Sequence, residues 1–202
     1  GRTLATMSAS GKATFAPLFE PKVQGFRKVP FGDADAIEAV LDDHVAAVLV
    51  EPIQGEAGVV MPPPGYLRRL RELTAARGVL LMFDEVQTGI GRTGKLFAFQ
   101  HEDARPDVLT LGKGLGAGVP LAAMLCDARY ACFQPGDQGG TYSGNALTAA
   151  VGQAVMDAVM APGFLEHVNA MSAKLRGVLE ALIPRGLVST VRGQGLLMAA
   201  EL

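Results

Sequence analysis

The sequence predicts an α/β fold in which a mostly parallel sheet is flanked by helices, followed by the start of a smaller α+β domain. Two apolar runs of strand length, residues 45–50 and 79–83, enclose a segment in which leucines recur at helical spacing. A strand, a helix and a strand in this order form a βαβ unit, which requires a parallel sheet with a right-handed crossover. Beyond Asn145 the pattern changes to two long helices, which indicates a different architecture near the end of the chain.

The chain before the first strand contains one predicted helix. Residues 1–32 are rich in Gly, Pro and small side chains without a sustained period, so we expect an irregular entry segment. Asp33 can cap a short helix that ends near His44. The apolar positions on one face of this helix are Ile37, Val40 and Leu41. The run 45–50 is continuously apolar, as expected for a strand that is buried on both faces.

The next helix and strand lead to two acidic residues. Pro62–Gly65 interrupt the chain before the helix, and Gly78 supplies its C-terminal stop. The buried positions of the helix are Leu67, Leu70 and Leu73. The strand 79–83 then ends abruptly at Asp84 and Glu85. Two further strands are expected at residues 108–111 and 121–126.

The last third of the chain is predicted to be mainly helical. Residues 146–160 are typical of a helix, and a second long helix stops at Pro184–Gly186. The buried stripe of this second helix comprises Leu165, Val168, Leu175, Leu179 and Leu182. We therefore expect two domains: residues 1–160 as a partial large domain and residues 161–202 as the start of a small domain.

Both ends of the chain suggest an internal segment of a longer protein. It begins at Gly1 without a methionine and ends at Leu202, inside an apolar run of strand character at 196–200. A parallel sheet without its neighbouring strands would expose apolar edges that are prone to association.

The composition favours a globular protein of the reducing cytosol. Of 202 residues 49% are hydrophobic, and the net charge of −2 without a Lys/Arg cluster argues against nucleic acid as a partner. The two cysteines are too few for a disulfide framework. No apolar run approaches the length of a membrane span, and no signal peptide opens the chain, so we expect no membrane partner.

Lys113 and Asp84 are the strongest candidates for chemistry. Asp84 follows an apolar strand, and in open α/β sheets ligands bind beyond the carboxyl ends of the strands. Lys113 stands between Gly112 and Gly114, which let the backbone pass close to a ligand without a Cβ clash. An enzyme that uses pyridoxal 5'-phosphate (PLP) needs an amine that bonds to the cofactor's aldehyde and a carboxylate that keeps the pyridine nitrogen protonated. The pair therefore predicts PLP, and we expect the Lys113 amine to be partly desolvated so that it can attack the aldehyde.

Taken together, the motifs of this chain resemble those of class III, fold-type I aminotransferases, most of all the acetylornithine aminotransferase group and its ornithine aminotransferase relatives. The matching runs are Gly1-Arg2-Thr3-Leu4, Glu51-Pro52-Ile53-Gln54-Gly55-Glu56, Asp84-Glu85-Val86-Gln87-Thr88-Gly89 with Gly91-Arg92-Thr93-Gly94, Leu111-Gly112-Lys113 and Gly139-Gly140-Thr141-Tyr142-Ser143-Gly144-Asn145. Their order and spacing match over essentially the whole chain, which makes the signal highly specific. The resemblance implies the seven-stranded type of sheet of the PLP-transferase large domain, incomplete here.

The resemblance also implies a role for each residue near the cofactor. Asp84 would pair with the pyridinium nitrogen, Val86 would pack on one face of the ring, and Gln87 would hydrogen-bond the ring hydroxyl. Glu85 lies in the same run and is counted with the cofactor-binding residues. Lys113 would hold the cofactor and then move the proton between the substrate carbon and the cofactor C4′.

Four further residues are assigned through the resemblance. Thr141 would donate to the cofactor phosphate of the neighbouring subunit, since the family places its sites at a homodimer interface. Arg2 would receive the substrate carboxylate in a bidentate manner. Glu56 would pair with a distal arginine that cannot be assigned in this chain, and so help the site accept either substrate. Gly140 replaces a serine that contacts substrate in many relatives, so only its backbone N–H remains for that contact.

The implied reaction is transfer of the terminal amino group of N-acetylornithine, or a close ω-amino acid, to 2-oxoglutarate, a step of arginine biosynthesis with ping-pong kinetics. Ornithine, succinylornithine and 4-aminobutyrate are alternative amino donors. A hypothesis of another class is a non-catalytic truncated scaffold that keeps the fold core, and retention of both Asp84 and Lys113 argues against it. A nucleotide phosphate loop at Gly112–Gly118 is disfavoured, because the run lacks the Walker pattern.

The remaining polar residues are expected to be structural. The histidines have no metal-ligand spacing, so no metal site is expected; they are His44, His101 and His167. Cys126 and Cys132 have neither a CxxC spacing nor an obvious base nearby. Glu51 and Arg92 are expected in structural salt bridges, and Arg192 is also expected to be structural.

Overall fold

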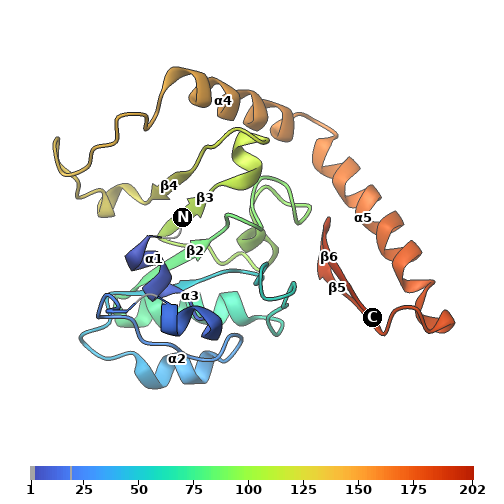
Figure 1. The fold of residues 1–202 in the computed structure, drawn as a ribbon, viewed down its shortest axis with the longest axis horizontal. Helices are drawn as coiled ribbons and strands as arrows, with labels where there is room; N and C mark the ends of the chain where they lie inside the picture. Colours follow the sequence, from blue (N-terminus) through green and yellow to red (C-terminus); the bar gives the residue numbers. More distant parts are fainter. Residues whose placement is uncertain (1–2, 19) are drawn as a thin grey trace. The chain divides into compact units, whose positions relative to one another are not determined.

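The computed structural model describes residues 3–18 and 20–202, and the chain divides into two compact units, Gly1–Val40 and Leu41–Leu202 (Figure 1). The domain boundary that the sequence predicts near residue 160 is a separate proposal. It is supported by the two-stranded sheet near the end of the chain, which is not part of the main sheet.

The first unit contains α1 (Leu4–Ala9), a 3-10 turn η1 (Ala13–Leu18) and α2 (Ala34–Val40). The hydroxyl of Ser8 is anchored between two segments, because it donates to Leu4 O at 2.8 Å and accepts from Val23 N–H at 2.9 Å. Because residues 4–9 and 13–18 are helical, the prediction that residues 1–32 are irregular is wrong for α1 and η1. A six-residue helix makes fewer than two turns, which is too short to produce a detectable hydrophobic period.

The helix α2 begins as predicted and ends early. Asp33 Oδ1 accepts from Ala36 N–H at 2.8 Å, which confirms the N-terminal cap. The helix ends at Val40 rather than near His44, and Ile37 is its buried position.

The second unit is built on a mixed four-stranded sheet. Its strands are β1 (Ala47–Val50), β2 (Leu80–Asp84), β3 (Val108–Leu111) and β4 (Ala123–Cys126), in the order β1-β2-β3-β4. The first three strands are parallel, and β4 pairs with β3 in the antiparallel direction. This arrangement confirms the α/β class and the mostly parallel sheet that the sequence predicts.

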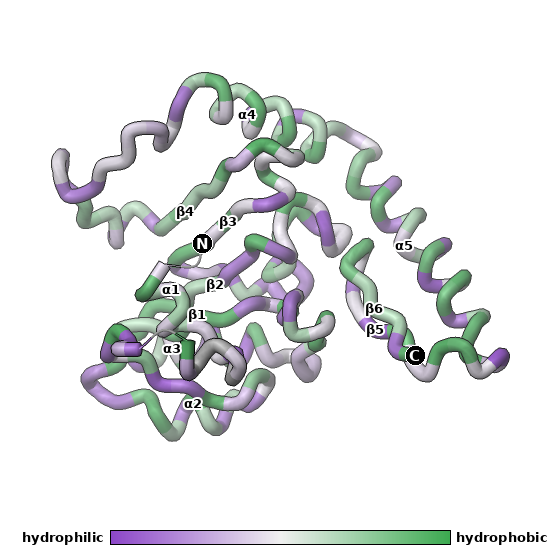
Figure 2. Tube along the Cα trace, in the orientation of Figure 1, coloured by the Kyte–Doolittle hydropathy of each residue, from purple (hydrophilic) through white to green (hydrophobic). Residues whose placement is uncertain are grey.

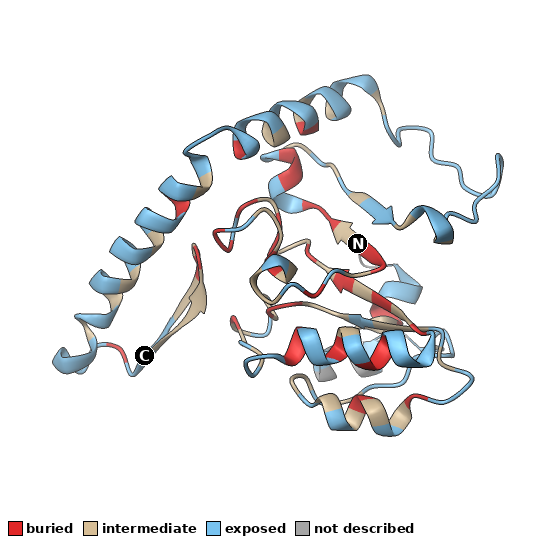
Figure 3. Cartoon of the chain, turned by 180° about the vertical axis from the view of Figure 1, so that it is seen from behind, coloured by how far each residue is buried: buried red, intermediate tan, exposed pale blue. Residues whose placement is uncertain are grey.

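The helix α3 (Tyr66–Arg77) connects β1 to β2 and buries the predicted leucines, with Leu70 at 0% exposure. Gly78 ends it in the left-handed region at φ 67°, as a glycine C-terminal stop requires. Figure 3 shows the buried stripe of this helix. The centre of the core lies on β2, where Leu81 and Phe83 are almost fully buried. The strand β1 is an edge strand, and Leu49 is 50% exposed, so its predicted burial on both faces is wrong.

Asp107, which precedes β3, ties three elements together. Its carboxylate accepts from Leu81 N–H at 2.8 Å and forms ion pairs with Arg71 at 2.9 Å and Arg129 at 3.1 Å. Burial raises the pKa of this carboxyl, but the hydrogen bonds and the two guanidinium charges outweigh that effect, so the pKa of Asp107 is lowered overall. A buried charge that is fully paired in this way fixes the register of β2, β3 and α3.

The end of the chain forms α4 (Ala146–Met160), α5 (Phe164–Glu180), a 3-10 turn η5 (Ile183–Arg185) and the antiparallel hairpin β5 (Thr190–Gln194) and β6 (Leu197–Glu201). The bounds of α4 match the prediction, and Asn145 caps it by accepting from Thr148 N–H at 3.0 Å. The strand β6 coincides with the predicted apolar run, whereas β5 was not predicted.

The apolar stripe predicted for α5 is only partly buried. Figure 2 shows apolar residues distributed along this helix, whereas Figure 3 shows that most of it is exposed. Val168 is its buried residue and Leu175 is 39% exposed, so the prediction of a fully buried stripe is wrong. Within the described residues no single helix is long and apolar enough to cross a membrane; only the bent pair Ala146–Met160 and Phe164–Arg185 meets that test, on length and composition.

Candidate active site

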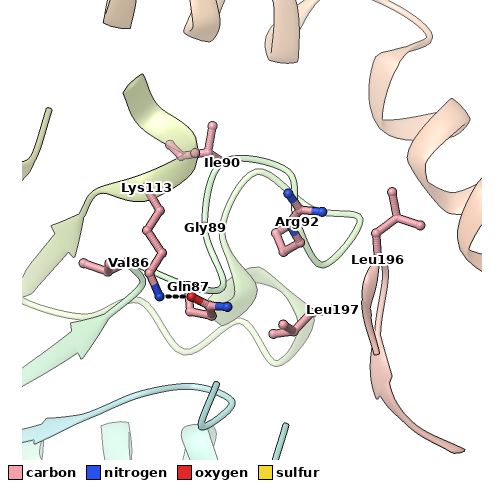
Figure 4. A pocket seen from close by; sticks show the side chains of 9 residues that line it. Val86, Gln87, Gly89, Ile90, Arg92, Lys113, Leu196 and Leu197 are labelled. Atoms are coloured by element: carbon pink, nitrogen blue, oxygen red, sulfur yellow. Dashed lines mark hydrogen bonds between the residues drawn. The ribbon is translucent and has the colours of Figure 1, made fainter. Parts of the chain in front are cut away.

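A cavity of about 250 Å³ lies beyond the carboxyl ends of β2 and β3 (Figure 4). Its wall comes from three segments: the turns at 86–92, the start of the 3-10 turn η3 (Lys113–Gly116), and Leu196 and Leu197 of the hairpin. The volume is just below the range of about 300–1,000 Å³ of small-molecule sites. Open α/β sheets bind ligands beyond the carboxyl ends of their strands, and this cavity lies at that position.

Lys113 reaches across the cavity to Gln87, and its amine donates a hydrogen bond to Gln87 Oε1 (Figure 4). Its backbone φ of 41° lies in the left-handed region, which is uncommon for a residue with a side chain. The side chain is exposed, so the expectation of a partly desolvated amine is not met by the described chain. The residues that line the cavity do not bury the Lys113 side chain.

Asp84 is the last residue of β2 and faces Thr110 of β3. Its Oδ1 accepts from Val86 N–H at 3.0 Å and from the Thr110 hydroxyl at 3.1 Å. These two bonds fix the carboxylate and leave its second oxygen without a hydrogen bond to another described residue. A carboxylate held in this way can accept from a protonated ring nitrogen.

Two glycines allow the backbone to pack closely against Val86 and Gln87. A Cβ atom on Gly112 would lie 3.4 Å from Val86, so the backbone that leads to Lys113 packs directly on the valine. A Cβ atom on Gly55 would lie 2.5 Å from Gln87 Cγ, a separation that real side chains do not adopt. Gly55 therefore determines where Gln87 lies. No role was predicted for Gly55, although it lies in the same motif run as Glu51 and Glu56.

Glu85 is buried and held by hydrogen bonds to the turn after β2, and its cofactor contact stays a prediction. Its side chain is 1% exposed. The carboxylate accepts from the Thr88 hydroxyl at 2.9 Å and from the N–H groups of Ala98 at 2.7 Å and Phe99 at 2.9 Å. Burial raises the pKa of Glu85, which the three hydrogen bonds oppose. The residue fixes the turn after β2 and does not line the cavity.

Glu51 lies beside the site and is not held by a salt bridge among the described residues. Its Oε2 accepts from Gly55 N–H at 3.0 Å. Burial raises the pKa of Glu51, and the negative charge of Asp84 adds to this, while the Gly55 hydrogen bond and the Lys113 charge oppose it. The predicted salt bridge is therefore replaced by a backbone hydrogen bond that shapes the loop against Gln87.

Arg192 is structural, as predicted, whereas Arg92 is not paired as predicted. The Arg192 guanidinium donates to Gly58 O at 2.9 Å and to Glu201 at 2.6 Å, and so it joins the hairpin to the loop after β1. The guanidinium of Arg92 is exposed, lines the cavity, and forms no ion pair within the part of the chain that the structure describes.

The remaining predicted site residues are not brought to the cavity. Glu56 is exposed in the loop after β1. Gly140 and Thr141 lie in the exposed segment 131–144 that projects beyond the sheet before α4 (Figure 1). Arg2 lies outside the described residues. The roles assigned to these four residues stay predictions.

The histidine nearest to the cavity is structural in its contacts. His101 Nε2 lies 3.1 Å from Thr93 O and 3.2 Å from Thr93 Oγ1, and burial lowers the pKa of its ring. Across the described residues no three His, Cys, Asp or Glu side chains gather in a way that could hold a metal ion.

The described residues fit one end of a PLP molecule. Lys113, the amide of Gln87 and the apolar side chain of Val86 line the cavity, and the carboxylate of Asp84 ends the strand that leads to Val86. A pyridine ring needs these groups for its aldehyde carbon, its nitrogen, its hydroxyl and one face.

Comparison with known proteins supports this assignment. The model of the family "Aminotransferase class-III" matches residues 1–202. Acetylornithine aminotransferase 2 of Bordetella pertussis is 50% identical over 202 residues, which cover 100% of this chain and 51% of that protein. The chain spans about half the length of the curated relatives it matches.

Solved structures agree. Ornithine aminotransferase from Toxoplasma gondii ME49 matches with a TM-score of 0.94 at 39% identity, covering 100% of this chain and 49% of that chain. Acetylornithine aminotransferase from Elizabethkingia anophelis matches with a TM-score of 0.83 at 44% identity, covering 87% of this chain and 45% of that chain.

Proposed function

This chain belongs to the class-III aminotransferase family, and we propose that it is the lysine-bearing part of a PLP-dependent aminotransferase. The observation that carries the proposal is the joint placement of Lys113, Gln87 and the carboxylate of Asp84 at the carboxyl ends of β2 and β3. PLP, when bound, carries the amino group between substrates and accepts the electrons released at the substrate carbon.

The residues of this chain have separate tasks in that reaction. Asp84 keeps the ring nitrogen protonated, because its orientation is fixed by Val86 N–H and Thr110. Gln87 accepts from the lysine amine, and its amide would hydrogen-bond the ring hydroxyl of a bound cofactor. Lys113 would hold the cofactor, and its amine would move a proton at the substrate carbon. Val86 supports one face of the ring.

We propose N-acetylornithine as the amino donor and 2-oxoglutarate as the acceptor, a reaction of arginine biosynthesis. The support is the identity of 50% to an acetylornithine aminotransferase and the matching motif residues. Ornithine, succinylornithine and 4-aminobutyrate are the alternative donors. Ornithine is supported by the match to a solved ornithine aminotransferase with a TM-score of 0.94.

The complete site is proposed to form in a cytosolic homodimer. Thr141 would donate to the cofactor phosphate of the neighbouring subunit, which agrees with its exposed position away from its own cavity. Arg2, Glu56 and the N–H of Gly140 would contact substrate.

The test is a half-reaction with the purified chain and PLP. N-acetylornithine, ornithine, succinylornithine and 4-aminobutyrate are added separately, and conversion of the cofactor to its amine form is followed by absorbance. The proposal expects conversion that is fastest with N-acetylornithine and absent in the Lys113→Ala variant. Conversion by none of the four donors would favour the non-catalytic scaffold, and a faster reaction with another donor would reassign the substrate.

A further inference from the structure

Glu51 is a carboxylate beside the cavity to which the proposed reaction gives no task. It directly follows the last residue of β1, and Asp84 is the last residue of β2. Because Val50 pairs with Phe83 in the parallel register, the two acidic residues come at the same end of neighbouring strands. Glu51 is half-buried and does not line the cavity. It therefore acts on the groups of the cavity through a neighbour or through its charge.

The carboxylate of Glu51 holds the backbone of Gly55. Its Oε2 accepts from Gly55 N–H at 3.0 Å. The carbonyl of Gly55 accepts from the N–H groups of Gly58 at 3.0 Å and Val59 at 3.1 Å. The same loop is joined to the hairpin by Arg192, which donates to Gly58 O at 2.9 Å. Both backbone polar groups of Gly55 are thus bonded, and the bond to its N–H depends on the Glu51 side chain.

Gly55 transmits its position to Gln87 and so to the lysine. A Cβ atom on Gly55 would lie 2.5 Å from Cγ, 3.1 Å from Cδ and 3.2 Å from Cβ of Gln87, so the glycine packs along this side chain as far as its amide carbon. Gln87 Oε1 in turn accepts from the Lys113 amine, and Figure 4 shows the two side chains directed at each other. A continuous row of contacts therefore runs from Glu51 to the amine: a hydrogen bond, a packing contact and a second hydrogen bond.

We propose that Glu51 is a positioning residue that orients the Lys113 amine through Gln87. A reactive group is held in its working direction when the residues that touch it are themselves locked by packing and hydrogen bonds from behind. The proposal rests on the proposed function, because that function makes Lys113 the group whose direction matters. It requires that loss of the Glu51 acceptor and loss of the Gln87 amide have the same consequence for the lysine.

A direct effect of charge is the competing account. Three charged residues act on Glu51 across space: Asp84, Lys113 and Glu56. Glu51→Gln separates the two accounts, because it removes the charge and keeps an oxygen that can accept from Gly55 N–H, whereas Glu51→Ala removes both. Positioning through contacts is recovered in Glu51→Gln, and an effect of charge is not.

The test measures the reactivity of the Lys113 amine in the purified chain without cofactor. A trace amount of acetic anhydride is added, and mass spectrometry compares the acetylation of Lys113 with that of Lys95, an exposed amine of the same chain. The variants are Glu51→Ala, Glu51→Gln, Gln87→Ala and the double variant Glu51→Ala/Gln87→Ala. Glu72→Ala is the matched control, because Glu72 is an exposed glutamate of α3 that does not line the cavity. Far-UV circular dichroism checks that each variant is folded.

The relative acetylation rate of Lys113 should rise roughly twofold to tenfold in Glu51→Ala and in Gln87→Ala, the factor that one hydrogen bond contributes, because the amine is released from its acceptor. The double variant should react like Gln87→Ala, because residues that act along one row of contacts are not additive. Glu51→Gln should recover most of the wild-type rate, and Glu72→Ala should react like the wild type.

Three results would overturn the proposal: an unchanged rate in Glu51→Ala, a double variant in which the two effects multiply, or a Glu51→Gln chain that reacts like Glu51→Ala. If Glu51→Ala does not fold, Glu51→Asp takes its place, alone and in the double variant. Its shorter side chain keeps the charge and withdraws the acceptor from Gly55 N–H, so it should react like Gln87→Ala, and a wild-type rate would contradict the proposal.

A separate measurement distinguishes failure of this proposal from failure of the proposed function. Borohydride reduction of the wild-type chain with PLP reports whether Lys113 captures the cofactor. Capture at Lys113 together with an unchanged acetylation rate in Glu51→Ala overturns only the role of Glu51. Absence of capture overturns the proposed function, and the acetylation series still decides whether Glu51 orients the amine, since it contains no cofactor.

Discussion

Glu85 and Glu102 allow a direct comparison of a buried and a half-exposed carboxylate that each accept three hydrogen bonds from backbone or side-chain donors. Glu85 accepts from Thr88, Ala98 and Phe99 in the interior. Glu102 accepts from the N–H groups of Gly65 at 3.0 Å, Leu67 at 2.9 Å and Arg68 at 3.2 Å, at the half-exposed start of α3. We expect Glu85→Ala to destabilise the fold much more than Glu102→Ala.

The magnitudes follow from what replaces each carboxylate. Removing Glu85 leaves two buried donors and one part-buried donor, Phe99 N–H, without an acceptor, and each buried donor costs about 1–3 kcal/mol. Release of a buried charge offsets part of this sum, so we take the lower end and expect a loss of about 3 kcal/mol or more. Water can solvate the helix start when Glu102 is removed, so its loss should be about 1 kcal/mol, as for other N-terminal caps.

The assay is urea unfolding of the three chains, followed by circular dichroism at one protein concentration. The account predicts a larger decrease of the unfolding free energy for Glu85→Ala by about 2 kcal/mol, the difference between the two losses. Equal losses for the two variants would refute the reasoning, because they would mean that burial of the donors does not determine the cost. A Glu85→Ala chain that binds PLP less well but unfolds like the wild type would restore Glu85 as a cofactor ligand.

Three further predictions test single contacts. Asp107→Asn should lower the unfolding free energy at neutral pH by about 1.5–3 kcal/mol, the range for hydrogen bonds to charged groups; because the folded pKa of Asp107 is lowered, its stabilisation is present above the ordinary pKa of 3.8 and is lost as pH falls through the folded pKa, so urea midpoints of the variant should depend less on pH in acid. Gly55→Ala should displace Gln87 and reduce cofactor capture at Lys113, measured as reduced adduct by mass spectrometry, and an unchanged yield would count against the contact. Gly195→Ala should destabilise the chain by roughly 1–3 kcal/mol, because the new methyl group clashes with the backbone of Thr93 and because the φ of 59° at residue 195 disfavours a side chain. An unchanged urea midpoint would contradict this.

The sequence predicts those parts of the fold whose signals are local. Residues 146–160 form a helix with the predicted bounds, because a capping Asn145 and helix-forming side chains lie in one continuous segment. The second core strand ends at Asp84, where the apolar run ends. The strand β5 was missed because Thr190–Gln194 contains glycine and three polar side chains and gains its stability from pairing with β6.

The site residues also divide into those with a local sequence signal and those that depend on contacts between distant parts of the chain. Lys113, Asp84 and Gln87 are predicted from motif and spacing, and the structure brings Lys113 and Gln87 into contact. The burial of Glu85 was not predicted from its motif, because two of its donors, Ala98 and Phe99, lie 13 and 14 positions away along the chain. The cap of α3 by Glu102 was also missed, since it joins residues 35 positions apart along the chain.

The central claim is that the described chain assembles a cofactor site around Lys113 and Asp84. The most direct measurement is incubation of the purified chain with PLP, reduction with borohydride, and mapping of the modified lysine by mass spectrometry, with Asp84→Ala as the comparison. The account predicts one stoichiometric adduct confined to Lys113 that is lost in Asp84→Ala. A scattered or absent adduct, or an adduct that does not depend on Asp84, would contradict it.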